Sequence, residues 1–205
     1  MAYRERLFNK DELEEFLLAV DRNLPGPTSI DIIGEAAAIL GLEAEGIGGR
    51  GTVDIDVVGN LSLLVGAMNQ ARQETGLDIP VETVGIYDAP YDYESRIERV
   101  DVPKLEYLQV FIPEKHDWVL MKAMRLSGRD LANISEVHQK VGLQAEVLLE
   151  RFLDEMTHVI GNTRNKIQDF LDLMESLYGE EETERAEVEI LDHPGWQERL
   201  RMEAL

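Results

Sequence analysis

The chain has 205 residues, of which 44% are apolar and 30% charged, as expected for one soluble globular domain or one domain with a helical appendage. It contains no cysteine, which excludes a disulfide scaffold, thiolate metal sites and cysteine nucleophiles, and we expect a cytoplasmic protein. Twenty basic and 41 acidic residues give a net charge of −21, which disfavours extended nucleic-acid binding. The longest uncharged stretch, residues 57–71, is too short for a membrane span, so we expect no membrane association.

The first part of the chain predicts an alternation of helices and strands. Asn9 and Glu12 have the spacing of a capping box, and the helix that they begin should end before residues 25–27, Pro-Gly-Pro. The β-branched run Thr28–Ile33 predicts a strand, and residues 35–40 predict a short helix. Further strands are predicted at 52–58, 81–87 and 105–112, a helix at 61–75, and a turn-rich segment at 88–99.

The second part of the chain predicts helices. Pro113 suits the start of a helix, and the apolar spacing indicates helices near 114–127, 130–140, 144–160 and 163–178. We therefore expect an α/β (α+β) fold, with a small mixed sheet followed by a C-terminal helical bundle. The expected division is an α/β core at 1–112, a helical region at 113–179 and an acidic tail with one weak element at 180–205.

The most informative motif is Asp54-Ile55-Asp56 in the strand predicted at 52–58. Strand side chains alternate, so both carboxylates should face one side, about 7 Å apart. Two like charges on one face repel, and a divalent cation such as Mg²⁺ or Mn²⁺ relieves that repulsion. The alternative is a solvated edge of an acidic protein.

A second feature is the turn at Gly34, where a predicted strand runs into a predicted helix. The backbone N–H groups at a helix N-terminus can bind a phosphate. With the Asp54 and Asp56 strand one loop later, the segment is suited to a nucleoside triphosphate whose metal is held by carboxylates. The alternative is a tight turn without a ligand.

The loop at 41–51 holds five glycines, and residues 46–51 match G-x-G-x-x-G. A dinucleotide-binding fingerprint follows a strand and begins a helix, whereas this motif follows a helix and leads into a strand. We therefore interpret it as a flexible loop, from which Arg50 could reach a phosphate. The absence of a Gly-Lys-Ser/Thr motif excludes a P-loop enzyme.

Lys122 lies in a predicted helix among seven apolar residues, which indicates burial. A buried lysine needs a partner, and Asp54, Asp56 or a bound phosphate would serve; the alternative is a side chain that extends past its neighbours to water. Asp130 either caps the following helix or adds a further carboxylate to the site.

These residues together resemble the nucleotidyltransferase superfamily, and most of all the bacterial nucleotidyltransferase-like proteins of unknown function that are related to abortive-infection and toxin–antitoxin systems. The resemblance covers about residues 8–140 and rests on residues 32–37, on Arg50-Gly51-Thr52-Val53-Asp54-Ile55-Asp56, and on Lys122, Arg125, Arg129 and Asp130. It implies Mg²⁺- or Mn²⁺-dependent transfer of a nucleoside monophosphate from a nucleoside triphosphate to an unknown acceptor. The implied catalytic residues are Asp54, Asp56, Lys122 and Asp130, the metal ligands are Asp54 and Asp56, and the nucleotide-binding residues are Gly34, Glu35, Arg50, Thr52 and Lys122.

The sequence departs from this superfamily at two points. Glu35 follows Gly34 where Ser or Gly is usual, and a third metal carboxylate is not evident, with Asp88 and Glu106 as candidates. The alternative function is therefore a catalytically inactive member that binds a nucleotide or a protein partner through its acidic surface.

Overall fold

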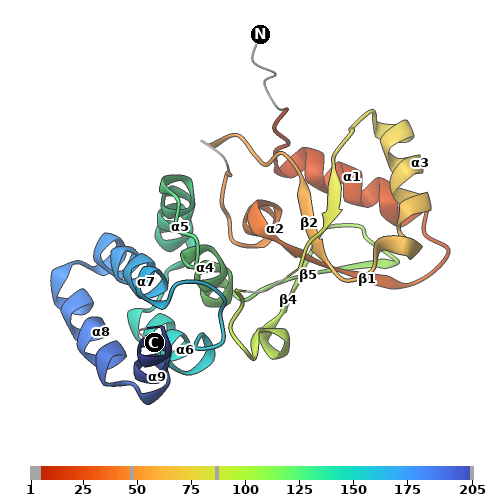
Figure 1. The fold of residues 1–205 in the computed structure, drawn as a ribbon. Coiled ribbons are helices and arrows are strands. Elements are labelled where there is room, and N and C mark those ends of the chain that lie inside the picture. The colour runs from red at the N-terminus through yellow and green to blue at the C-terminus, as the bar shows by residue number, and fades with distance from the viewer. Residues whose placement is uncertain (1–5, 47–48, 86–87, 204–205) are drawn as a thin grey trace, which may run out of the picture. The chain divides into compact units, whose positions relative to one another are not determined.

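The computed structural model describes residues 6–46, 49–85 and 88–203 and divides the chain into two compact units (Figure 1). The first, the α/β unit, comprises Met1–Gly85 and Ile97–Pro113. The second, the helical unit, comprises Ile86–Arg96 and Glu114–Leu205, so a short segment between two strands belongs to the helices. Within the described ranges, no helix combines the length and apolar character needed to cross a membrane.

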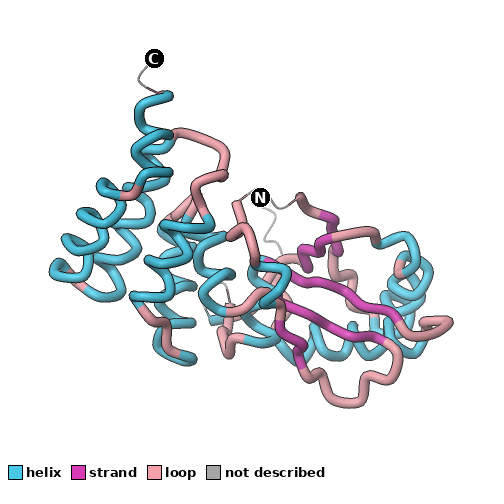
Figure 2. The backbone as a smooth tube through the Cα atoms, turned by 90° about the horizontal axis from the view of Figure 1, so that it is seen from below, coloured by secondary structure: helices cyan, strands magenta, loops and turns pink. Residues whose placement is uncertain are grey.

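The α/β unit is built on a five-stranded mixed sheet of order β3-β2-β1-β5-β4. Its strands are magenta in Figure 2. Strand β1 is central, antiparallel to β2 and parallel to β5, while β3 runs parallel to β2 and β4 antiparallel to β5. This confirms the predicted α/β class with a mixed sheet. The strands are β1 (Thr28–Ile33), β2 (Ile55–Val58), β3 (Val81–Thr83), β4 (Glu98–Val100) and β5 (Leu108–Ile112).

Three helices pack against one face of this sheet. Helix α1 (Lys10–Arg22) begins with the predicted capping box between Asn9 and Glu12. Helix α2 (Gly34–Gly41) follows β1 directly, and α3 (Val65–Thr75), after the short helix η2 (Leu61–Leu63), ends at Gly76 as predicted. Apolar side chains from α1 and the α3 region surround those of the sheet in the core, among them Phe16, Leu17, Val20, Ile30, Ile55, Leu64, Met68 and Leu108.

Two strands are shorter than predicted, for visible reasons. Thr52 exchanges backbone hydrogen bonds with Phe8 outside the sheet, and regular pairing of β2 starts only at Ile55. Before β5, the buried carboxylate of Asp21 accepts the N–H groups of residues 106, 107 and 108, so the strand begins at Leu108.

Other sequence expectations need correction or lie outside the described residues. β4 occupies part of the segment 88–99 that we expected to be turn-rich, and the short helix η3 (Tyr93–Arg96) precedes it. The strand predicted at 81–87 is observed only over Val81–Thr83, and residues 86–87 lie outside the described ranges. So do residues 47–48 of the glycine-rich loop.

The helical unit contains the predicted helices and two more. Helices α4 (Lys115–Ala123), α5 (Gly128–Val141), α6 (Ala145–Glu155) and α7 (Thr163–Tyr178) lie close to their predicted positions. Their common core includes Phe152 of α6 and Phe170 of α7, whose rings stack with centroids 4.0 Å apart.

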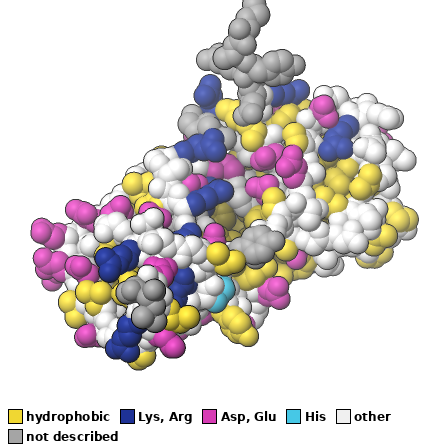
Figure 3. Space-filling view, in the orientation of Figure 1, with side chains coloured by type: hydrophobic (Ala, Val, Ile, Leu, Met, Phe, Trp, Pro, Cys, Tyr) yellow, Lys and Arg dark blue, Asp and Glu magenta, His cyan; other side chains and the backbone are white. Residues whose placement is uncertain are grey.

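The expected acidic tail with one weak element is instead two packed helices, α8 (Glu180–Asp192) and α9 (Pro194–Met202). Trp196 is fully buried, stacks on Phe152 at 4.5 Å and donates its Nε1–H to the Phe152 carbonyl. Acidic side chains gather on the outside of the unit near the start of α8, whose first turn is Glu180–Glu182 (Figure 3). Because this segment is rich in charged residues, its few buried apolar residues were not enough to predict packed helices from the sequence.

Candidate active site

The turn between β1 and α2 brings Gly34 and Asp56 into direct contact. Gly34 has φ +68°, a left-handed conformation that glycine adopts without strain. A Cβ atom at this position would lie 2.7 Å from Oδ2 of Asp56, closer than two such atoms can approach. The contact follows from the sheet register, in which Ile33 pairs with Asp56. Gly34 therefore leaves the space in which the Asp56 carboxylate lies.

This contact places a carboxylate at the N-terminal end of α2. The N-cap residue, Ile33, has no polar side chain with which to cap the helix, and Glu35 lies in the first turn. A helix N-terminus carries partial positive charge, which stabilises a nearby anion. The turn therefore combines a backbone suited to an anion with two acidic side chains, Glu35 and Asp56.

Asp54 lies directly before β2, because the strand begins at Ile55 rather than at residue 52. The side chain of Thr52 donates a hydrogen bond to the Asp54 carbonyl at 3.1 Å, and Thr52 is 1% exposed. Thr52 thus shapes the backbone that leads into the Asp54-Ile55-Asp56 motif. Its proposed contact with a nucleotide stays a prediction.

The sheet register sets a second carboxylate beside Asp56 that the sequence analysis did not consider. Asp56 pairs with Glu82 of β3, and directly paired residues project their side chains from the same face. Neither earlier candidate for a third carboxylate is a register partner of Asp56. Asp88 belongs to the helical unit and lies 4.0 Å from Lys166, and Glu106 precedes β5 at the end of the sheet opposite Gly34. The strand-like alternation in Val81-Glu82-Thr83 is the feature of the sequence from which the position of Glu82 could have been inferred.

No group of three or more His, Cys, Asp or Glu side chains in the described ranges is arranged to hold a metal ion by itself. An ion at this site would therefore need oxygen ligands from elsewhere.

Arg50 lies beside a cavity of about 490 Å³ within the α/β unit. The cavity lies between the start of α1 and the loop after α2, and its lining includes Lys10 but neither Asp54 nor Asp56. The contribution of Arg50 to phosphate binding stays a prediction. The lining residues are Asn9, Lys10, Asp11, Ile39, Glu43, Ala44, Glu45, Gly49 and Arg50.

In the helical unit, Lys122 and Asp130 come together. Lys122 is 5% exposed, its Nζ lies 3.4 Å from Oδ1 of Asp130, and it sits over the Trp118 ring at 4.9 Å. This confirms the predicted burial of Lys122 and supplies a partner that the sequence analysis did not consider for it. Asp130 also forms a capping box with Ser127, which confirms the helix-capping alternative. Burial opposes ionisation of Asp130, yet hydrogen bonds from Ser127 and the charge of Lys122 lower its pKa.

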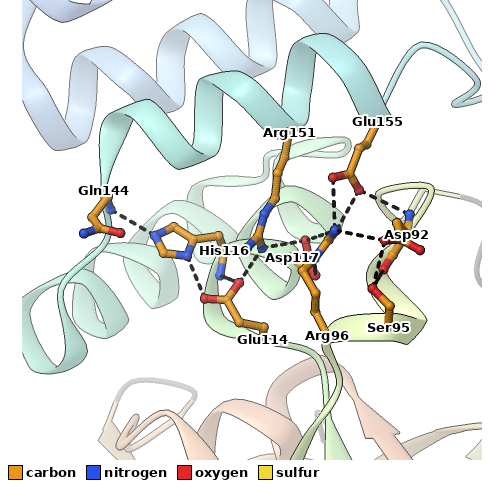
Figure 4. Close-up of polar contacts among 9 residues, drawn as sticks. All are labelled: Asp92, Ser95, Arg96, Glu114, His116, Asp117, Gln144, Arg151 and Glu155. Atoms are coloured by element: carbon orange, nitrogen blue, oxygen red, sulfur yellow. Dashed lines mark hydrogen bonds and ion pairs between the residues drawn. The ribbon is translucent and has the colours of Figure 1, made fainter.

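The helical unit also contains a network of charged side chains around the buried Asp117, which links Arg96 to α4 and α6 (Figure 4). Asp117, which is fully buried, binds Arg96 through two hydrogen bonds of 2.8 and 3.0 Å and Arg151 at 2.8 Å. Arg96 also binds Glu155, and Arg151 also binds Glu114. Each charge of the network thus has an opposite charge within the same unit, which indicates a structural role.

His116 extends this network through both of its ring nitrogens. Nδ1 lies 2.7 Å from Glu114, and Nε2 accepts the backbone N–H of Gln144 at 3.0 Å. Because Nε2 accepts, the ring proton lies on Nδ1 and is donated to Glu114. Burial raises the pKa of Glu114, but the bonds from His116 and Arg151 outweigh it and bring the pKa to about 2.

Comparison with known protein families gives a match over most of the chain. The model of a family described as "Nucleotidyltransferase of unknown function (DUF6036)" matches residues 10–186. No curated protein and no solved structure matched the chain. The matched range contains Gly34, Asp54, Asp56, Lys122 and Asp130, and it covers most of the chain. The protein therefore belongs to the DUF6036 family of nucleotidyltransferases of unknown function.

Proposed function

We propose that this protein transfers a nucleoside monophosphate from a nucleoside triphosphate to an acceptor, with Asp54 and Asp56 as ligands of a divalent cation. Family membership supports the reaction class. The observation that carries the site is the contact between the Gly34 turn and Asp56, because it joins an anion-binding backbone to a carboxylate.

The residues present fit an Mg²⁺ or Mn²⁺ ion that binds together with the substrate. Mg²⁺ commonly binds one or two carboxylates plus the phosphates of a substrate, rather than an all-protein cage. Asp54 and Asp56 supply two such carboxylates, and the described residues offer no three-ligand group. When bound, the ion would neutralise charge on the phosphates.

The protein's own residues would then orient the triphosphate. The backbone at the start of α2 would hold phosphate oxygens, and Arg50 of the same unit would add positive charge. An acceptor hydroxyl would attack the α-phosphorus; the bond to the β-phosphate oxygen would break, pyrophosphate would leave, and the hydroxyl proton would pass to solvent or a nearby carboxylate. The net charge of −21 favours a small acceptor or a protein side chain over a long RNA.

A second function is favoured by Glu35. It lies in the first turn of α2, where its carboxylate adds negative charge beside the proposed phosphate position. A non-catalytic member would bind the nucleotide, or a protein partner, without turnover.

The test is incubation of the protein with α-³²P-labelled nucleoside triphosphates, Mg²⁺ or Mn²⁺ and a cell extract, followed by detection of labelled products. We expect label in a product with the wild type and a loss of about a thousandfold with Asp56→Asn, because a metal ligand contributes several kcal/mol. Asp78→Asn is the matched control, since the Asp78 side chain is 97% exposed.

Two other outcomes separate the hypotheses. Without labelled product, an Asp56-dependent rise in melting temperature with metal and triphosphate would support the non-catalytic binder. With neither labelling nor a thermal shift in the wild type, both nucleotide-based functions would be wrong.

A further inference from the structure

The two faces of the sheet in the α/β unit differ in character. One face carries Ile30, Ile55 and Leu108, which pack against α1 and the α3 region. Helix α2 packs on the same face, because Gly41 lies against Ile112 and Val100. The residues between these, on the opposite face, are half-buried or exposed and mostly polar. They include Ser29, Asp31, Asp56, Glu82, Arg99, Gln109 and Phe111.

On this polar face, one row of register partners crosses four strands, from Val58 of β2, which pairs with Asp31, to Arg99 of β4. Asp31 of β1 pairs with Phe111 of β5, and Phe111 pairs with Arg99 of β4. Directly paired residues have side chains on one face, so Phe111 has a carboxylate on one side and a guanidinium on the other. Phe111 and Asp31 are half-buried and Arg99 is exposed. An aromatic ring with this accessibility, between opposite charges, is suited to a planar polar ligand.

The row that contains Asp31, Phe111 and Arg99 lies close enough to the proposed phosphate site for one nucleotide to reach both. Asp31 is two residues before Ile33, the partner of Asp56, so the row is adjacent to the Asp56 row on the same face. Strands β2 and β5 are separated by two strand spacings, about 10 Å. A nucleotide whose phosphates lie at Gly34 and Asp56 could thus extend its base toward Phe111.

We propose that Phe111 is the platform on which the base of the bound nucleotide stacks, and that Asp31 and Arg99 contact opposite edges of that base. This inference rests on the proposed function and adds a specificity-determining subsite to it. Stacking on an aromatic side chain favours every base. A carboxylate accepts from amino and imino N–H groups, and arginine donates to the O6 and N7 atoms of guanine. The pair of edges therefore favours guanine over adenine.

The test compares ligands with and without a base, bound to the intact 205-residue chain. Isothermal titration with Mn²⁺ measures the affinities for GTP, ATP and tripolyphosphate. We expect the wild type to prefer GTP to ATP, and Phe111→Leu to weaken GTP binding about tenfold while leaving tripolyphosphate binding unchanged. Arg99→Ala should bring GTP and ATP affinities together. Gln109→Ala, on the same strand and face, is the matched control and should change neither affinity.

Each other outcome has a definite meaning. Unchanged GTP affinity in Phe111→Leu overturns the platform, and an equal loss for GTP and tripolyphosphate shows a structural role instead. Equal GTP and ATP affinities in the wild type overturn the edge contacts. Asp56→Asn tests the proposed function separately: loss of both GTP and tripolyphosphate binding in this variant would support that function, whatever the Phe111 and Arg99 variants show. If the wild type binds none of GTP, ATP and tripolyphosphate, the proposed function is wrong, and the base subsite that rests on it is wrong too.

Discussion

Asp117 of the helical unit and Asp56 of the α/β unit are both carboxylates on regular elements, but their surroundings differ. Asp117 is fully buried between Arg96 and Arg151, which neutralise it within the same unit. Asp56 is half-buried, lies against a glycine turn and has Glu82 as a register neighbour. The first arrangement balances charge within the fold, whereas the second concentrates negative charge, which the proposed function assigns to the binding of a divalent cation.

The strongest test of this contrast removes Asp117. Asp117→Ala should lower the free energy of unfolding by about 3–5 kcal/mol, because Arg96 and Arg151 lose a buried partner. Urea denaturation measures the change. Asp92→Ala is the control, since Asp92 is 66% exposed and 3.8 Å from the same Arg96, and it should cost less than about 1 kcal/mol. Equal costs would contradict a structural network centred on Asp117.

A second test concerns the C-terminal helices of the helical unit. Trp196→Ala should cost about 3–4 kcal/mol, because it leaves a cavity beside Phe152 and removes a buried hydrogen bond. Met202→Ala, on the same helix at 68% exposure, should change stability by less than about 0.5 kcal/mol. A near-neutral Trp196→Ala would mean that α8 and α9 contribute little to the fold.

A third test compares two glycines of the α/β unit. Gly34 and Gly76 have nearly equal φ, +68° and +69°, but a Cβ meets Asp56 only at Gly34 and nothing within 4 Å at Gly76. Both alanine variants should lose about 1–2 kcal/mol from backbone strain. Gly34→Ala should lose about 1 kcal/mol more from the clash, and should also lose nucleotide binding. If Gly34→Ala and Gly76→Ala had similar effects on nucleotide binding, the Gly34 turn would not be part of the nucleotide site.

A fourth test concerns the effect of pH on the helical unit. Because the pKa of Glu114 is lowered to about 2, its contribution to stability is complete above the unfolded value of 4.5 and is lost as the pH falls from 4.5 toward 2. Glu114→Gln should therefore flatten the dependence of the unfolding free energy on pH in this window. Urea denaturation across it, with the exposed Glu98→Gln as control, measures the difference. If Glu114→Gln left the slope of the unfolding free energy against pH unchanged, groups other than Glu114 would cause the loss of stability in acid.

Local signals in the sequence predicted much of the fold. The capping box at Asn9 and Glu12, the β-branched run of β1 and the apolar stripes of α6 and α7 act within a few residues, and the structure contains each element. The acidic segment after residue 179 was wrongly expected to be a tail. Its burial depends on Trp196 and two apolar residues of α8, Ala186 and Ile190, and not on average composition.

The candidate site was only partly predictable. The Gly34 turn and the Asp54-Ile55-Asp56 motif are local, so the sequence indicates them. The positions of Glu82, Asp31 and Phe111 beside the motif depend on which strands pair and in what register. The partners of Asp117 come from residues 21 and 34 positions away along the chain. Such contacts between distant residues require the folded structure.

The most direct test of the central claim is electron paramagnetic resonance of Mn²⁺ titrated into the protein with a non-hydrolysable nucleoside triphosphate. The account predicts that the wild type and Asp78→Asn bind Mn²⁺ together with the nucleotide, and that Asp56→Asn binds neither tightly although it remains folded. Equal binding of Mn²⁺ and nucleotide by the wild type and Asp56→Asn would contradict it.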